Sequence, residues 1–280
     1  SCAQRPHSQM NPRFTLPRLV LIILSALLST TRAADVYIVA GQSNGFRLSS
    51  LAQGGVPIPG GHKIYYYGMA CVSEPESSTF KVLTGLNPNS MGTELALHLV
   101  EQSNEDIILI QYCRCGAPVT KLSPTTWFPG TDPQKGELYT EGLYPKFQRY
   151  IAHAKRSAVE DHQLTWEMKG LFWHQGESDA EIGHASAHQA ALQNLFWRFR
   201  QDVGERLPIV CGEIRPLTLH AKQINAGMAA LADADSLTAL AITSNIAAPS
   251  NPKNPGDVHF RLEACQEIGR RLAKAHARLT

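Results

Sequence analysis

Residues 36–44 read Val-Tyr-Ile-Val-Ala-Gly-Gln-Ser-Asn, an apolar run that ends at a glycine and is followed at once by polar side chains. The β-branched residues predict a buried strand over Val36–Ala40, and Gly41 marks its end. In open α/β sheets, ligands bind beyond the carboxyl ends of the strands. We therefore expect Ser43 to lie in a polar loop at this edge, where its hydroxyl can act as a nucleophile.

Outside this stretch, segments with strand and helix patterns alternate along the chain. The run at 107–110 is apolar without alternation, as expected for a strand covered on both faces. Such an order predicts an α/β fold, a three-layer α/β/α sandwich with a mostly parallel central sheet. We expect strands at 36–40, 63–67, 106–111, 168–173, 207–211 and 238–243, helices at 92–103, 144–161, 185–203, 220–232 and 261–278, and long loops at 73–90 and 122–143.

The N-terminal segment has the pattern of an export signal. Arg13 and Arg18 precede an apolar run from Leu19 to Leu28, and small residues lead up to Ala33. This pattern predicts a leader over residues 1–33, with a signal peptide at about 10–33, and cleavage after Ala33. The apolar run is short for a bilayer span, so an uncleaved anchor is the weaker alternative. Residues 34–280 are then a single mature domain, secreted or periplasmic, with no stable membrane anchor.

Composition excludes some partners and leaves the cysteine chemistry open. The chain has 280 residues, 43% of them hydrophobic and 18% charged, with a net charge of +2. Because no long basic run occurs, we expect no nucleic-acid partner. After removal of the leader five cysteines remain, an odd number. They are either small buried hydrophobic residues or include a disulfide from Cys71 to Cys113 or Cys115.

A serine nucleophile needs a base within hydrogen-bond reach, and the base needs an orienting acid. His259 is the predicted base, in a polar segment just before the last predicted helix. Asp257 lies two residues earlier, and in an extended segment the two side chains point to the same side; a helix-capping role for Asp257 is the alternative. Glu177 is a second candidate acid, which either accepts from His259 or holds loops together through backbone amides. We expect both acids to contribute, with the larger share for Asp257.

Acyl transfer also needs donors for the oxyanion. The candidates are the amide of Ser43, the amide of Gly116, and the side-chain amide of Gln175. For substrate contacts we expect Gln42, Asn44 and Trp127, although Trp127 could equally serve as packing for the long loop. His174 and Glu177 have the spacing of a metal pair, but no third ligand is evident nearby, so we expect no metal.

Three segments resemble the blocks of the SGNH hydrolase superfamily, and within it the sialate O-acetylesterase-like group that includes carbohydrate esterase family six. Gly41–Asn44 looks like the first block, Cys113–Val119 like a degenerate second block, and Trp173–Asp179 is a close match to the third. Asn89–Leu95 is similar to a helix start seen in these enzymes. The resemblance implies an SGNH/flavodoxin-like fold for residues 34–280, with Ser43 as the nucleophile.

The resemblance also implies an activity: a secreted serine esterase that removes O-acetyl groups from carbohydrates such as acetylated xylan or sialic acids, without a cofactor. The alternatives are a general short-chain carboxylesterase and a non-catalytic carbohydrate-binding protein. One departure stands out, because many members have aspartate three residues before the histidine, where this chain has Gly256. Asp257, at the shorter spacing, leaves open which acid orients His259. The oligomeric state is not indicated.

Overall fold

The strand expected at 36–40 lies at the centre of the sheet. The structure, a computed structural model, describes residues 31–68, 78–120, 122–128, 130, 139, 141–246, 253–254 and 256–280. Arg32–Thr280 forms one unit of the chain. The leader predicted over residues 1–33 lies almost wholly outside the described residues.

The described residues form a seven-stranded sheet in the order β4-β3-β6-β1-β7-β8-β9. All neighbouring strands are parallel except β4, which pairs antiparallel with β3 at one edge. The strands are β1 (Ala34–Gly41), β3 (Ile64–Gly68), β4 (Lys81–Leu83), β6 (Asp106–Cys113), β7 (Glu167–His174), β8 (Ile209–Gly212) and β9 (Thr238–Ala241). A separate antiparallel pair joins β2 (Gln53–Pro57) and β5 (Gly85–Leu86).

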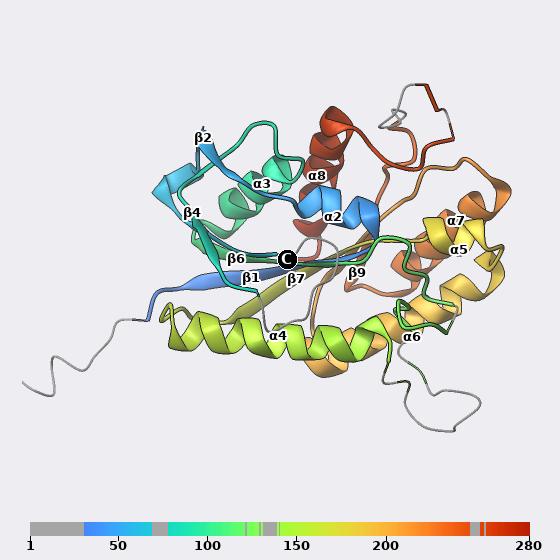
Figure 1. Cartoon of the computed structure of the whole chain (residues 1–280), viewed down its shortest axis with the longest axis horizontal. Helices are drawn as coiled ribbons and strands as arrows, with labels where there is room; N and C mark the ends of the chain where they lie inside the picture. Colours follow the sequence, from blue (N-terminus) through green and yellow to red (C-terminus); the bar gives the residue numbers. More distant parts are fainter. Residues whose placement is uncertain are drawn as a thin grey trace, which may run out of the picture. The chain divides into compact units, whose positions relative to one another are not determined.

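Helices cover both faces of the sheet, so the expected three-layer fold is confirmed (Figure 1). The helices are α2 (Ser43–Ser49), η1 (Pro59–Gly61), α3 (Thr93–Ser103), α4 (Leu143–Glu160), α5 (Glu177–Glu181), α6 (Ala185–Val203), α7 (Leu219–Ala234) and α8 (Leu262–His276). Buried side chains of α2, α3 and α8 form one core with the sheet, and those of α4, α6 and α7 form another.

The side chains of β1 explain why its sequence is apolar without alternation. Val36, Ile38 and Ala40 belong to the core on the α4 side, whereas Tyr37 and Val39 belong to the core on the α8 side. Successive side chains of a strand point to opposite faces. Because both faces are covered, every position from 36 to 40 must be apolar.

All six strands and five helices expected from the sequence are present, with ends shifted by one or a few residues. The short elements α2, η1, α5, β2, β4 and β5 were not predicted from the sequence. Ser43 was expected in a loop, but it is the first residue of α2. A helix of seven residues is too short to show a clear apolar period in the sequence.

Three of the four described cysteines after the leader, Cys113, Cys211 and Cys265, are buried, as expected for small hydrophobic residues. Cys115 is exposed. Cys71 lies outside the described residues, so its predicted pairing stays a prediction. None of the helices in the described part of the chain has the length and apolarity needed to cross a membrane.

Candidate functional site

A glycine at the end of β1 permits the sharp turn that presents Ser43. Gly41 has φ +135°, a conformation that side-chain-bearing residues rarely adopt. A Cβ there would lie 2.1 Å from the carbonyl oxygen of His174, on the neighbouring strand β7. Past this turn, the Gln42 amide donates to the same carbonyl at 3.0 Å. The turn thus fixes the start of α2 against the end of β7.

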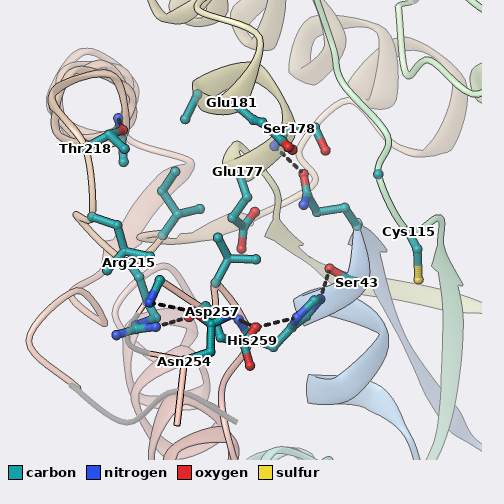
Figure 2. A pocket seen from close by; sticks show the side chains of 18 residues that line it. Ser43, Cys115, Glu177, Ser178, Glu181, Arg215, Thr218, Asn254, Asp257 and His259 are labelled. Carbon is teal, nitrogen blue, oxygen red and sulfur yellow. Dashed lines mark hydrogen bonds and ion pairs between the residues drawn. The ribbon is translucent and has the colours of Figure 1, made fainter. Parts of the chain in front are cut away.

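Ser43, His259 and Asp257 form a continuous chain of hydrogen bonds (Figure 2). Ser43 Oγ lies 3.0 Å from His259 Nε2, and His259 Nδ1 lies 2.9 Å from Asp257 Oδ1. Because a carboxylate can only accept, Nδ1 carries the proton and Nε2 is left as the acceptor for the serine hydroxyl. The same Asp257 oxygen accepts from the His259 amide at 3.1 Å. The arrangement is that of a nucleophile, a base and an orienting acid.

Asp257 therefore does not cap the last helix. That helix, α8, has Arg261 as its N-cap residue, with no side-chain cap. A second contact holds the Asp257 segment from another side, since Arg215 donates from Nη1 to the Asp257 carbonyl oxygen.

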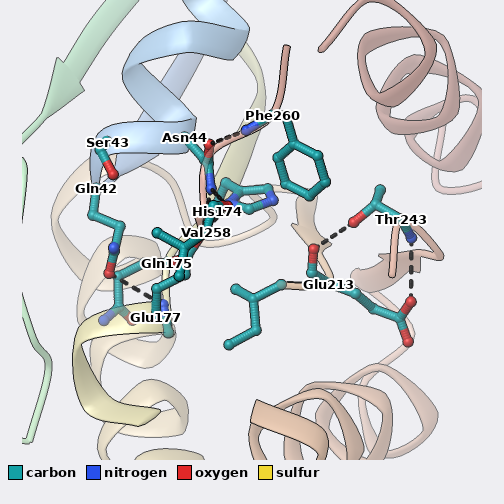
Figure 3. A network of polar contacts seen from close by, with 12 residues as sticks. Gln42, Ser43, Asn44, His174, Gln175, Glu177, Glu213, Thr243, Val258 and Phe260 are labelled. Carbon is teal, nitrogen blue, oxygen red and sulfur yellow. Dashed lines mark hydrogen bonds and ion pairs between the residues drawn. The ribbon is translucent and has the colours of Figure 1, made fainter. Parts of the chain in front are cut away.

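Asn44 links Glu177 to Val258 and Phe260, the two residues that flank His259 (Figure 3). Asn44 Nδ2 donates to Glu177 Oε1 at 2.6 Å and to the Val258 carbonyl at 3.0 Å. Asn44 Oδ1 accepts from the Phe260 amide at 3.3 Å. One carboxamide thus binds the peptide groups on both sides of His259. Asn44 has no exposed surface, so the prediction that it contacts substrate is wrong.

His174 is packed next to Glu177 without a hydrogen-bond partner for its ring among the described residues. Its Nδ1 lies 3.7 Å from Glu177 Oε1. Burial lowers the pKa of His174, and the Glu177 carboxylate opposes this only in part, so the ring is neutral. No group of three or more potential metal ligands occurs among the residues that the structure describes.

Ser43 and Gly116 are the predicted oxyanion donors that line the cavity. The Ser43 amide, as the first of α2, has no acceptor within that helix. Gly116 follows β6 and has φ +68°, which favours glycine at that position.

Gln175 is not available as an oxyanion donor in this structure. Its side chain has no exposed surface, and Nε2 donates to the Ala117 carbonyl at 3.1 Å and to Asp179 Oδ2. Both hydrogens are therefore in use, and the prediction of an oxyanion role is corrected to a structural one. His188 Nε2 lies 3.2 Å from Gln175 Oε1, and burial lowers the pKa of His188 to about 4.

Asp179 was missed by the sequence reading and holds the loop that carries Gly116. Its carboxylate accepts from the amides of Val119 and Thr120, each at 3.1 Å. The same short helix, α5, thus carries two carboxylates with different partners. Glu177 accepts from Asn44, whereas Asp179 accepts from the backbone that follows Gly116. A carboxylate two residues after Glu177 was the only sequence signal for this role.

Two further predicted substrate residues have different outcomes. Trp127 has no exposed surface, and its Nε1 donates to the Gly41 carbonyl at 2.9 Å. It belongs to the core beneath the turn, so the prediction that it contacts substrate is wrong. Gln42 lines the cavity, although its Oε1 also accepts from the amides of Gly176 and Ser178 at 3.4 and 3.3 Å.

Ser43, Asp257 and His259 line a cavity of about 780 Å³, a typical size for a small-molecule site. Figure 2 shows Ser43 and Cys115 on one side of it and Thr218, Arg215 and Asn254 on the other. The sequence reading missed Arg215. It follows β8 by three residues, so a charged residue just beyond a parallel strand was the available signal.

Comparison with protein families finds a match over most of the chain. The family model described as "Carbohydrate esterase, sialic acid-specific acetylesterase" matches residues 71–278, well over half of the 280-residue chain. The matched range contains Glu177, Asp257 and His259 but begins after Ser43. No curated protein sequence matches the chain.

Several solved structures share the fold. A protein from Arabidopsis thaliana superposes with a TM-score of 0.60 at 16% identity, covering 87% of this chain and 97% of its own. NanS gives 0.55 at 17% identity, over 88% and 97%. A carbohydrate acetylesterase from Xanthomonas citri gives 0.54 at 14% identity, over 86% and 55%. With the fold shared and the family model matched, the chain belongs to the carbohydrate esterase family of sialic acid-specific acetylesterases.

Proposed function

We propose that this protein is a serine esterase that removes O-acetyl groups from carbohydrates through an acyl-enzyme intermediate. The observation that carries the proposal is the hydrogen-bonded chain from Ser43 through His259 to Asp257, which opens on a cavity. Family membership supports an acetyl ester as the substrate.

In the first half of the reaction, Ser43 Oγ attacks the acetyl carbonyl carbon while His259 Nε2 takes the hydroxyl proton. Asp257 keeps the imidazole in the required tautomer and stabilises the imidazolium. The amides of Ser43 and Gly116 are the proposed donors to the oxyanion, and each such donor is worth roughly 3 kcal/mol of barrier. When the intermediate collapses, the sugar oxygen leaves and takes the proton from His259.

In the second half, a water molecule attacks the acetyl-Ser43 carbonyl carbon and gives its proton to His259. The bond from the carbonyl carbon to Ser43 Oγ then breaks, the proton returns to Oγ, and acetic acid leaves and ionises to acetate in solvent. Each proton transfer involves His259 Nε2. Its partner is Ser43 Oγ, which lies 3.0 Å away, or the sugar oxygen or water bound beside it.

The two alternatives, a general short-chain esterase and a non-catalytic binding protein, are separated by assays on the purified protein. We expect acetate release from an acetylated glycan, faster hydrolysis of 4-nitrophenyl acetate than of the octanoate ester, and labelling of Ser43 by a fluorophosphonate. Equal rates on acetate and octanoate would favour a general esterase. A folded protein with neither turnover nor labelling would overturn the proposal.

We further propose that the protein is exported and that the mature chain begins at Ala34. Processing there would remove Arg32, which donates from Nη2 to Asp106 Oδ1 at 3.0 Å. Asp106 Oδ1 would keep the amide of Lys63 at 2.9 Å. Mass spectrometry of the protein from the extracytoplasmic fraction should find an N-terminus at Ala34 or Asp35, whereas intact chain confined to the cytoplasm would contradict export.

A further inference from the structure

A second, smaller hollow lies beside the active-site cavity, and we call it the side groove. Its volume is about 330 Å³, within the range of small-ligand sites. Three residues that line it, Gly116, Ser178 and Glu181, also line the cavity that contains Ser43. The side groove is therefore continuous with the active-site cavity, and the two meet at Gly116 and α5.

The two walls of the side groove are fixed to each other. One wall is the loop after β6, and the other is α5. Asp179 of α5 accepts from the amides of Val119 and Thr120 in that loop, each at 3.1 Å. The Pro118 carbonyl of the same loop accepts from the Trp127 amide at 2.8 Å. Because the walls are already in place, a ligand that binds between them pays little for ordering the protein.

Two polar side chains of α5 lack partners within the described part of the chain. The Ser178 amide donates to Gln42 Oε1, but neither the Ser178 hydroxyl nor the Glu181 carboxylate makes a hydrogen bond or ion pair there. Only 8% of Ser178 is exposed, and a hydroxyl so deeply buried is normally hydrogen-bonded. The two residues are three apart and lie on the helix that borders the cavity (Figure 2). They are placed to bind hydroxyl groups of a ligand, because a carboxylate accepts and a serine both donates and accepts.

The rest of the side groove favours an uncharged ligand that also has apolar faces. Ile182 is 40% exposed and lies one turn after Ser178, and Pro118 lies on the opposite wall. Glu181 is the only charged residue among the described residues that line the groove, so it disfavours an anion there. A neutral sugar fits these properties, because its ring has C–H faces for Ile182 and hydroxyl groups for Glu181 and Ser178.

We propose that the side groove is a subsite for a second, neutral sugar, so that the protein prefers an acetylated sugar within a glycan chain over the same sugar alone. The proposal rests on the proposed function and adds the form of the substrate. Gly116, a proposed oxyanion donor, lies at the junction of the groove and the cavity. An acetyl group held at Ser43 thus lies next to the entrance of the groove, where a sugar linked to the acetylated one can enter.

The test compares acetate release from matched substrates with and without further sugars. One pair is the methyl glycoside of an O-acetylated sialic acid and the same acetylated sugar linked to lactose. The other pair is the methyl glycoside of acetylated xylose and a xylotriose with the same acetylated unit at its end. In the pair that is hydrolysed, we expect kcat/KM to be about ten-fold higher for the longer substrate, the value of one or two hydrogen bonds to a charged group. The gain should appear mostly in KM, because the second sugar contacts the protein alike before and during the reaction.

Two substitutions test the groove itself. Glu181→Ala and Ile182→Ala should each lower the preference for the longer substrate, and the double variant should abolish it. Glu181→Gln should keep part of the preference, because the amide oxygen still accepts from hydroxyl groups. The matched controls are Glu160→Ala and Val159→Ala, both exposed on α4 and outside the groove.

Hydrolysis of 4-nitrophenyl acetate by each variant separates binding of the second sugar from damage to the loop that carries Gly116. An equal loss on the nitrophenyl ester, the short substrate and the long substrate would mean that these residues only support the loop, and would overturn the proposal. Equal kcat/KM for the two members of the hydrolysed pair in the wild-type protein would overturn it too.

Binding gives a reading that does not depend on turnover. Calorimetry on the Ser43→Ala protein should show tighter binding of the longer member of a pair, and the difference should vanish in Ser43→Ala/Glu181→Ala/Ile182→Ala. If the wild-type protein hydrolyses none of the esters, the proposed function fails, while this comparison still decides whether the groove binds a sugar. Equal affinities within both pairs, or no measurable binding of any of the four compounds, would reject the subsite.

Discussion

Replacing Ser43 with alanine is expected to lower kcat for 4-nitrophenyl acetate by about a million-fold, as loss of a serine nucleophile does in other triad enzymes. The change removes one oxygen from a side chain that makes a single described hydrogen bond, to His259, so the fold should be unaffected. Circular dichroism and a thermal melt check the fold, and steady-state hydrolysis measures the loss. Ser157→Ala, on α4 and outside the cavity, is the control.

The Ser43→Ala protein should also lose labelling by the fluorophosphonate, because the bond forms at Oγ. A folded Ser43→Ala protein that keeps near-normal turnover would exclude the acyl-enzyme mechanism. Retained labelling at a different residue would identify another nucleophile, and the cavity-lining thiol of Cys115 would be the first to examine.

The architecture of this protein was predictable because its signals are regular along the chain. The run at 36–40 is apolar on both faces, and the structure places both faces in cores. Parallel strands bring their carboxyl ends to one edge, so residues after β1, β6 and β7 were expected to meet there. The contact of His259 with Asp257 was predictable for another reason, because a two-residue spacing in an extended segment leaves little freedom.

The roles of single side chains were harder to predict, because they depend on rotamers and on partners far away in sequence. Asn44 follows Ser43, which favours a substrate role, but its carboxamide is bound by peptide groups more than 200 residues later. The side-chain amide of Gln175 donates both of its hydrogens, one to Asp179 and one to the Ala117 carbonyl. An amide side chain has several donors and acceptors, and sequence does not show which neighbours will use them.

The second large effect that we predict is an unequal contribution of Asp257 and Glu177 to catalysis. Asp257 contacts the imidazole directly, whereas Glu177 reaches it only through Asn44 and the peptide groups around His259. Asp257→Asn should therefore lower kcat by about 10⁴, because the asparagine amide favours the wrong tautomer of His259. A loss of this size is in line with the expectation from the sequence that Asp257, two residues before His259, contributes more to catalysis than Glu177.

Glu177→Gln should lower kcat far less than Asp257→Asn does, by about ten-fold. The glutamine oxygen can still accept from Asn44 Nδ2 at the position of Glu177 Oε1. Glu177→Ala should cost more than Glu177→Gln, since it leaves that donor without its partner in a buried site. If Glu177 acts by positioning, Asn44→Ala should reproduce the Glu177→Ala loss, and the double variant should lose little more than either alone, as residues of one network do.

Glu101→Gln and Asp161→Asn, both exposed, are the controls. A Glu177→Gln loss as large as that of Asp257→Asn would show instead that the charge of Glu177 acts on the histidine, and unchanged activity in an Asp257→Asn/Glu177→Gln double variant would refute His259 as the base.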